Sequence, residues 1–128
     1  MISIIIPKEI QIIYKYCFTN CYSLACVSIP ASVNQIGRNA FTSAVNLKRI
    51  SIPDGVESIE TDLFNNCFTL KQVVIPDGVT SIKNHAFSDC TELNDLSLPD
   101  SIISIEDYAF FTCANLEDIT IPQSVTTI

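Results

Sequence analysis

The chain has 128 residues, of which 48% are hydrophobic, so it is long and apolar enough to form one domain with a continuous core. This composition excludes a disordered chain, and the formal net charge of -7 argues against a general nucleic-acid binder, because phosphate neutralisation requires clustered lysine and arginine. No apolar run approaches the about 20 residues that span a bilayer, so membrane insertion is not expected.

Charge is unevenly distributed along the chain. All seven lysines and arginines lie at or before Lys83, whereas eight of the fourteen acidic residues lie between Asp89 and Asp118. The first part of the chain is therefore near neutral and the last part is strongly acidic.

Prolines recur at a constant interval of 23 residues, which is the signature of a repeat protein. They are Pro7, Pro30, Pro53, Pro76, Pro99 and Pro122. Counted from a column of leucines, the repeats divide residues 1–128 into units 1–23, 24–46, 47–69, 70–92, 93–115 and a partial unit 116–128. We expect a single uncapped array with no linker.

Each unit is expected to begin with a short strand, because apolar residues alternate directly before the proline, as in Leu47, Ile50 and Ile52. The proline ends the strand, since it has no backbone N–H to donate.

Turn residues follow the proline, and Asp54-Gly55 is a typical turn dipeptide. The β-branched residues that come next, such as Val56 and Ile59, predict a second short extended segment.

A phenylalanine column then occupies the second half of the units, at Phe18, Phe41, Phe64, Phe87 and Phe110. The polar residues after it fit a single helical or 3-10 turn that returns to the next strand. One unit cannot bury its apolar side alone, so we expect neighbouring units to stack about 4.8 Å apart with the phenylalanines as the spine of the core. The predicted fold class is α/β, a β-rich solenoid of short parallel strands.

The segments ISIPDGVESIETDLFNNCFTL and LSLPDSIISIEDYAFFTCANL resemble the 23-residue repeat of the BspA-like leucine-rich repeat family, L-x-x-I-x-I-P-x-x-V-x-x-I-x-x-x-A-F-x-x-C-x-x-L. Ala44 departs from the cysteine of this pattern, and Leu63 departs from the alanine. The resemblance implies a leucine-rich repeat solenoid and adhesion to a protein, at the cell surface or after secretion. An intracellular leucine-rich scaffold is the alternative.

Four cysteines share one column, at Cys21, Cys67, Cys90 and Cys113. Neighbouring members would lie close enough for a disulfide, but parallel stacking points their side chains the same way, so reduced and buried thiols are favoured. Zinc is not expected, because the chain has no short paired cysteine spacing.

Other candidates for chemistry are also weak. His85 is expected to be exposed, and a catalytic dyad with Cys90 is disfavoured because Cys90 belongs to the core column. Asp54, Asp77 and Asp100 form a column after the proline, where a turn role is favoured over calcium binding. With no convergent acid, base and nucleophile, we expect no enzyme activity and no cofactor from these residues. A separate enzymatic domain attached to the array remains an alternative.

Outward strand positions are where neighbouring units differ, and they run from basic to acidic along the array. Such a polarised ladder would orient a protein partner with the opposite gradient, whereas the alternative is a solvated face with no partner. The candidate protein-binding residues are Lys48, Arg49, Lys71, Gln72, Val74, Asn94, Asp95, Glu117, Asp118 and Thr120. Open ends of the array also predict end-to-end self-association.

Overall fold

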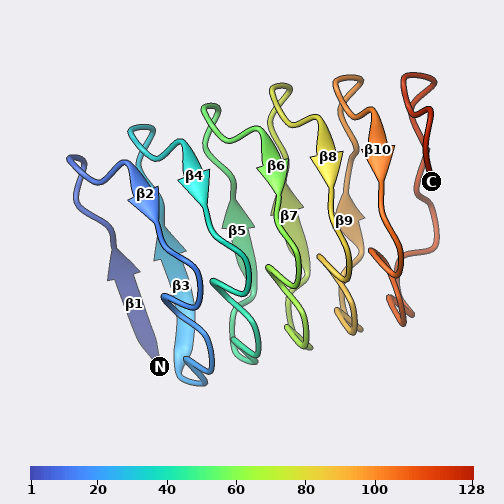
Figure 1. Ribbon diagram of the computed structural model, residues 1–128. Coiled ribbons are helices and arrows are strands. Elements are labelled where there is room, and N and C mark those ends of the chain that lie inside the picture. The colour runs from blue at the N-terminus through green and yellow to red at the C-terminus, as the bar shows by residue number, and fades with distance from the viewer.

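The computed structural model describes residues 1–128 as a stack of coils, of which the first five contribute short strands and turns (Figure 1). We number the coils as the repeat units, so that the third coil is 47–69. The strands are β1 (Ile2–Ile5), β2 (Ile12–Ile13), β3 (Leu24–Ser28), β4 (Gln35–Ile36), β5 (Arg49–Ser51), β6 (Ser58–Ile59), β7 (Gln72–Val74), β8 (Ser81–Ile82), β9 (Asp95–Leu96) and β10 (Ser104–Ile105).

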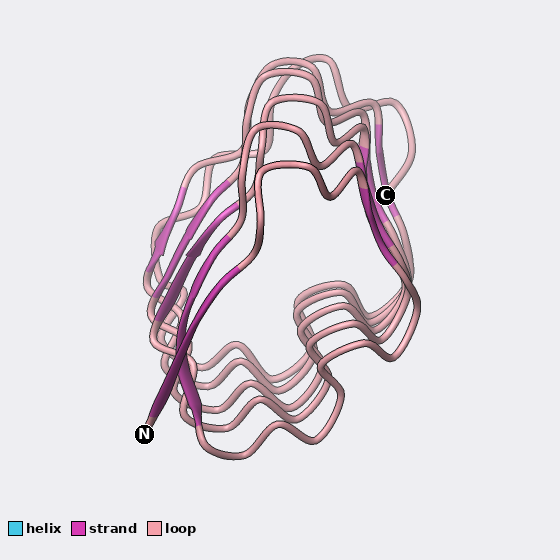
Figure 2. Cartoon of the chain, turned by 90° about the vertical axis from the view of Figure 1, so that its left-hand side faces the viewer, coloured by secondary structure: helices cyan, strands magenta, loops and turns pink.

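The strands form two parallel ladders on opposite sides of the stack (Figure 2). The first ladder consists of a two-stranded sheet, β1-β3, and a three-stranded sheet, β5-β7-β9. The second ladder consists of the sheets β2-β4 and β6-β8-β10. Equivalent residues of successive coils lie side by side, as Ile59 pairs with Ile82 and Ile82 with Ile105. Both the strand before the proline and the second extended segment are therefore confirmed.

A hydrogen-bonded turn follows the proline in each coil that has a second strand. In the third coil the Val56 N–H donates to the Pro53 carbonyl oxygen at 3.1 Å. Asp54 occupies the exposed tip of this turn. Asp54 therefore lies in the turn, as expected from its place after the proline.

The expected helical or 3-10 turn after the second strand is not seen, and the structure contains no helix. Separate β-turns take its place: the Asn65 N–H donates to the Asp62 oxygen at 3.2 Å, and the Cys67 N–H donates to the Phe64 oxygen at 3.1 Å. Two residues per coil have left-handed φ angles between 56° and 62°, which interrupts a right-handed helix. These residues are Tyr16, Asn20, Asn39, Ser43, Asp62, Asn66, His85, Asp89, Tyr108 and Thr112.

Stacking explains why these left-handed residues are tolerated. In the first four coils their amides donate along the stack to the next coil, as from Asp62 to the Asn84 oxygen at 3.0 Å and from Asp89 to the Phe111 oxygen at 2.7 Å. The left-handed conformation thus lets the turns continue the inter-coil hydrogen bonding that the strands provide elsewhere. These inter-coil hydrogen bonds offset the conformational cost of the positive φ.

The core lies between the two ladders and contains 30 buried hydrophobic residues. Phe41, Phe64 and Phe87 are fully buried. Their rings are stacked with centroids 5.8 Å apart between Phe41 and Phe64 and 5.4 Å apart between Phe64 and Phe87. Phe18 and Phe110 extend the stack at either end, at 5.3 and 5.5 Å. The phenylalanine spine is therefore confirmed.

Candidate functional site

The outward side chains of the first ladder form the candidate surface. Because side chains alternate along a strand, Ile50 points into the core while Arg49 and Ser51 face solvent. The same alternation exposes Asp95 beside buried Leu96. The third to fifth coils thus present a continuous row of polar groups on a rigid sheet.

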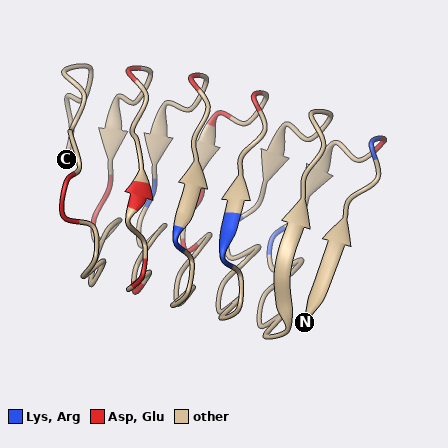
Figure 3. Cartoon of the chain, turned by 180° about the vertical axis from the view of Figure 1, so that it is seen from behind, with Lys and Arg blue, Asp and Glu red and all other residues tan.

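Six of the ten candidate residues line one shallow hollow of about 250 Å³ on this face. They are Lys48, Arg49, Lys71, Gln72, Asn94 and Asp95. Arg49, Gln72 and Asp95 occupy paired positions on β5, β7 and β9. Lysine and arginine lie at the β5 and β7 side of the row and acidic residues at the β9 side and beyond (Figure 3).

Side-chain contacts fix part of this row. Gln72 donates from Nε2 to Asp95 Oδ2 at 2.7 Å, and this hydrogen bond links the side chains of β7 and β9. Lys71 lies 3.7 Å from Glu92, but both side chains are largely exposed, so this ion pair contributes little to stability. Lys48 and Arg49 form no salt bridge, which leaves both cations available to a ligand.

The structure does not bring the other four candidates into the hollow. Val74 is 51% exposed and lies at the end of β7, where it lines a separate hollow with Arg49 and Gln72. Asp118 and Thr120 line a third hollow at the end of the array, and Glu117 is exposed. The polar face is therefore divided into adjacent hollows.

His85 lies against an aromatic side chain. Its ring stacks on Tyr108 with centroids 5.0 Å apart, and the residue is half-buried, less exposed than its variable position predicts. Cys90 is fully buried, and its thiol donates to the Phe64 carbonyl oxygen. Burial strongly raises the pKa of Cys90, so the reactive thiolate is disfavoured.

All six cysteines are free. Cys67 and Cys90 are buried, as expected, whereas Cys21 and Cys113 at the two ends of the column are half-buried. Burial raises the pKa of Cys67 to about 12 and that of Cys113 to about 11.

Sequence reasoning missed an apolar surface on the first coil. Ile5 is 81% exposed and Tyr14 is 73% exposed, and Ile2 and Ile12 are exposed beside them. All four occupy columns that face solvent, and other coils fill these columns mostly with polar residues or glycine. A unit-by-unit comparison of the outward-facing columns would have revealed this apolar surface, because it separates exposed apolar residues from those of the core.

The stacked coils, leucine column, phenylalanine spine and parallel ladders define a leucine-rich repeat solenoid. The family described as BspA type Leucine rich repeat region matches in six copies over residues 1–78 and 57–128. The chain belongs to this family. Leucine-rich repeat solenoids of this kind are generally non-catalytic and serve as protein-interaction repeats.

Solved structures of bacterial leucine-rich repeat proteins are similar to this chain. A protein from T. pallidum has 34% sequence identity and a TM-score of 0.89, and the match covers 94% of this chain and 58% of that one. A protein from Bacteroides ovatus has 32% identity and a TM-score of 0.73, with 96% and 38% covered.

A third structure, described as a leucine rich cell surface protein from Faecalibacterium prausnitzii, has 25% identity and a TM-score of 0.52, with 92% and 47% covered. This chain thus spans between 38% and 58% of the lengths of these three proteins. A comparison with curated protein sequences gives no match. The structure has no helix with the length and apolarity needed to cross a bilayer.

Proposed function

We propose that this chain is a non-catalytic adhesion segment of a longer surface protein and that it binds a protein partner through the outward face of β5, β7 and β9. The observation that supports this proposal is the shared hollow of six candidate residues, in which Lys48 and Arg49 form no salt bridge and Asp95 lies two strands away. A partner with acidic groups opposite β5 and basic groups opposite β9 would complement this gradient.

Rigidity favours recognition by this face. Gln72 and Asp95 are held by a mutual hydrogen bond, and the strands below them are anchored by the core. A partner therefore meets side chains whose spacing is already set, which reduces the entropy that binding would cost.

A surface location is supported by similarity alone, since the similar Faecalibacterium prausnitzii protein is a leucine rich cell surface protein. An intracellular scaffold would use the same face. A leader or membrane anchor in the full gene distinguishes the two. An enzyme activity in the full protein would require a catalytic domain outside these residues.

Charge reversal on the face tests the proposal. Wild-type chain and the double variant Lys48→Glu, Arg49→Glu are immobilised and exposed to host-cell surface proteins, and a partner retained by the wild type is then purified and titrated. We expect the variant to bind this partner at least about tenfold more weakly, with a faster association rate for wild type at low salt.

The matched control is the double variant Lys8→Glu, Lys15→Glu, which makes the same charge change at exposed positions of the first coil. It should bind like the wild type. Equal binding by the β5 double variant would exclude this face and direct attention to the turns around Tyr108 and Phe111.

A further inference from the structure

The second ladder shows how neighbouring coils normally pair. Between the third and fourth coils, the Thr80 N–H donates to the Glu57 oxygen at 2.8 Å and the Lys83 N–H donates to the Ile59 oxygen at 2.9 Å. Equivalent bonds join the first coil to the second and the fourth to the fifth. The edges of β6, β8 and β10 are thereby satisfied where they face one another.

The second and third coils do not pair in this way, and β4 and β6 are separate in the sheet topology. By register with the other coils, the N–H groups of Glu57 and Glu60 would donate to the oxygens of Asn34 and Ile36, and the Ile36 N–H would donate to the Ser58 oxygen. None of these three bonds is formed. Two strand edges with unpaired donors and acceptors therefore face each other in the middle of the array.

The first ladder is open at the same level, between β3 and β5. The coils stay joined through their turns, where the Phe41 N–H donates to the Leu63 oxygen at 3.1 Å and the Ser43 N–H donates to the Asn65 oxygen at 2.8 Å. The first and second coils, by contrast, are so close that a Cβ on Gly37 would overlap the main-chain nitrogen of Lys15.

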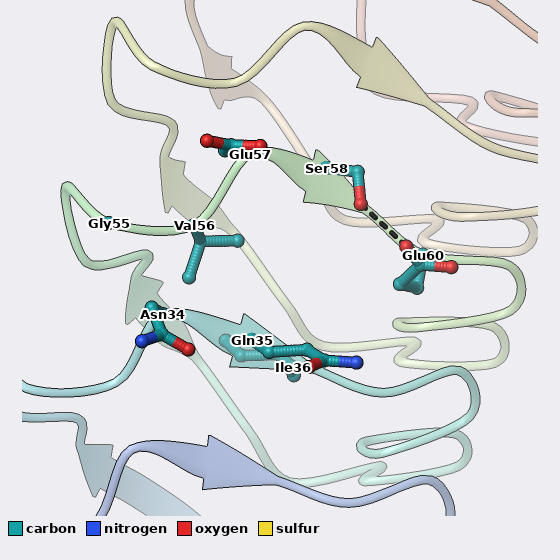
Figure 4. Close-up of a pocket in the computed structure, with 8 residues that line it drawn as sticks. All are labelled: Asn34, Gln35, Ile36, Gly55, Val56, Glu57, Ser58 and Glu60. Atoms are coloured by element: carbon teal, nitrogen blue, oxygen red, sulfur yellow. Dashed lines mark hydrogen bonds between the residues drawn. The ribbon is translucent and has the colours of Figure 1, made fainter.

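A polar hollow of about 390 Å³ lies between β4 and β6 (Figure 4). It is lined by Asn34, Gln35, Ile36, Gly55, Val56, Glu57, Ser58 and Glu60. The Glu60 carboxylate already accepts a hydrogen bond from Ser58 Oγ at 2.5 Å, and it lies 3.0 Å from Lys83 Nζ. Glu57 is exposed and forms no salt bridge, so it is the uncompensated charge at this hollow.

Leu63 distinguishes the third coil from the other coils. It is fully buried in a column that otherwise holds Cys17, Ala40, Ala86 and Ala109, and it directly precedes Phe64 of the spine. The ring pair of Phe41 and Phe64 has the widest spacing in the spine, at 5.8 Å against 5.3 to 5.5 Å elsewhere. The Phe41 hydrogen bond to the Leu63 oxygen is 3.1 Å, whereas its equivalents in the other coils are 2.8 Å.

We propose that the opening between β4 and β6 is a binding site for an extended peptide segment that carries a lysine or arginine, and that Leu63 keeps this opening available. The unpaired N–H and C=O groups of the two edges recognise the peptide backbone, as sheet edges do when they accept an added strand. Glu57 recognises the basic side chain. The site lies on the second ladder, so it is independent of the proposed partner surface on β5, β7 and β9.

The chain itself contains a segment of the required chemistry. Residues 78–84 already pair with the other edge of β6, where their main chain bonds to Glu57 and Ile59 and Lys83 pairs with Glu60. A peptide of this sequence, GVTSIKN with blocked ends, is therefore the probe that we would use. It can donate its backbone N–H groups to β4, and it carries one lysine.

Amide hydrogen exchange of the free protein is the first test. We expect the amides of Glu57 and Glu60 to exchange at least about a hundredfold faster than those of Thr80 and Lys83, which occupy the same positions one coil later. Equal protection at the four amides would show that the ladder is closed in solution and would overturn the proposal.

The second test is a titration of the isotope-labelled protein with the probe peptide, monitored through the NMR chemical shifts of the backbone amides. Saturable shifts should appear at Ile36, Glu57 and Glu60. A peptide with N-methyl groups on the threonine and lysine nitrogens keeps the side chains but lacks two backbone donors, and it should bind at least tenfold more weakly. Equal binding of the two peptides, no binding of the first, or shifts confined to other strands would overturn the proposal.

Two variants complete the design. Glu57→Lys changes an exposed side chain and should weaken binding of the lysine peptide at least about fivefold without unfolding the chain. Leu63→Ala should close the opening and thereby abolish binding, although the peptide does not contact Leu63. Leu70→Ala removes the same atoms from a fully buried position in the leucine column and should leave binding unchanged. Binding that survives both Glu57→Lys and Leu63→Ala would contradict the assignment.

Discussion

The thiol of Cys90 donates a hydrogen bond to the main-chain oxygen of Phe64, on the preceding coil, across 3.2 Å. The same contact recurs from Cys67 to Phe41 and from Cys113 to Phe87, at 3.1 Å each. The cysteine column therefore does more than fill space, because the protonated thiols of Cys67, Cys90 and Cys113 each link their coil to the one before. Ala44, the exception in this column, is fully buried and makes no such link.

This link predicts a loss of stability at high pH. Burial raises the pKa of Cys67 from 9.0 to about 12, so the unfolded chain loses this proton at lower pH than the folded chain does. The stabilisation is fully present below pH 9 and is lost as the pH rises towards 12, by up to about 1.4 kcal/mol per pH unit. Urea unfolding between pH 8 and pH 11 should show this decline.

Cys67→Ala is the control for that experiment, since alanine already occupies the equivalent position at residue 44. The variant should have a shallower decline of unfolding free energy above pH 9 than the wild type. Parallel declines would mean that Cys67 does not contribute to the alkaline instability.

Removing one ring from the phenylalanine spine should strongly destabilise the fold. Phe64 is fully buried between Phe41 and Phe87, so Phe64→Ala leaves a cavity in the middle of the core and should cost about 3–5 kcal/mol. Phe111→Ala removes the same atoms from a side chain that is 53% exposed, and it should cost less than about 1 kcal/mol. Similar costs in denaturant unfolding would contradict the role of the spine.

The sequence was sufficient to predict the coil and its core because both depend on repeated columns. Ile59 and Phe64 recur in phase with their equivalents, and stacking places like residues over like. The turns were not predictable in the same way. Left-handed φ at Tyr16 and Ser43 contradicts the preference of these residue types, and the N–H of each donates to the next coil, a contact that only the stacked structure reveals.

The candidate surfaces were likewise predictable from the sequence only in part. The gradient from Lys48 to Asp95 is readable from outward columns, but only the structure shows which of these residues share a hollow. The opening between β4 and β6 was not predictable, because the repeat pattern places every pair of neighbouring coils in the same register.

Thr112 offers a way to stabilise the chain. It is a β-branched, exposed residue with φ at 58°, and its N–H has no partner on the next coil, unlike the other residues of its column. Left-handed backbone costs about 1–2 kcal/mol for most residue types, and asparagine tolerates it best after glycine. Thr112→Asn should therefore raise the free energy of unfolding by about 1 kcal/mol.

Thr126→Asn is the matched control, because Thr126 is also exposed but does not have a positive φ. It should leave the unfolding free energy within about 0.5 kcal/mol of wild type. A gain of equal size at both sites would show that backbone strain at Thr112 is not the cause.

The exposed apolar side chains of the first coil predict self-association of this chain. Ile5 and Tyr14 are 81% and 73% exposed, and contact between copies would remove them from water. Light scattering should show an average mass that rises with concentration, and the double variant Ile5→Ser, Tyr14→Ser should reduce this rise.

Phe68→Ser with Val74→Ser is the control for that prediction, because it removes exposed apolar side chains from the middle of the array. It should associate like the wild type. A constant monomer mass for wild type at millimolar concentration would exclude association through the first coil.

Leu63 predicts an unusual stability result. Leu→Ala at a fully buried site commonly costs about 2–5 kcal/mol, because the cavity persists, and we expect this of Leu70→Ala. At Leu63 the alanine matches the equivalent residues 40, 86 and 109, so the second and third coils can approach and form the missing ladder bonds. Each such bond contributes about 0.5–1.5 kcal/mol, which offsets the lost burial. Leu63→Ala should therefore cost at least about 2 kcal/mol less than Leu70→Ala in urea unfolding, and it should slow amide exchange at Glu57 and Glu60. An equal cost with unchanged exchange would show that the opening has another cause.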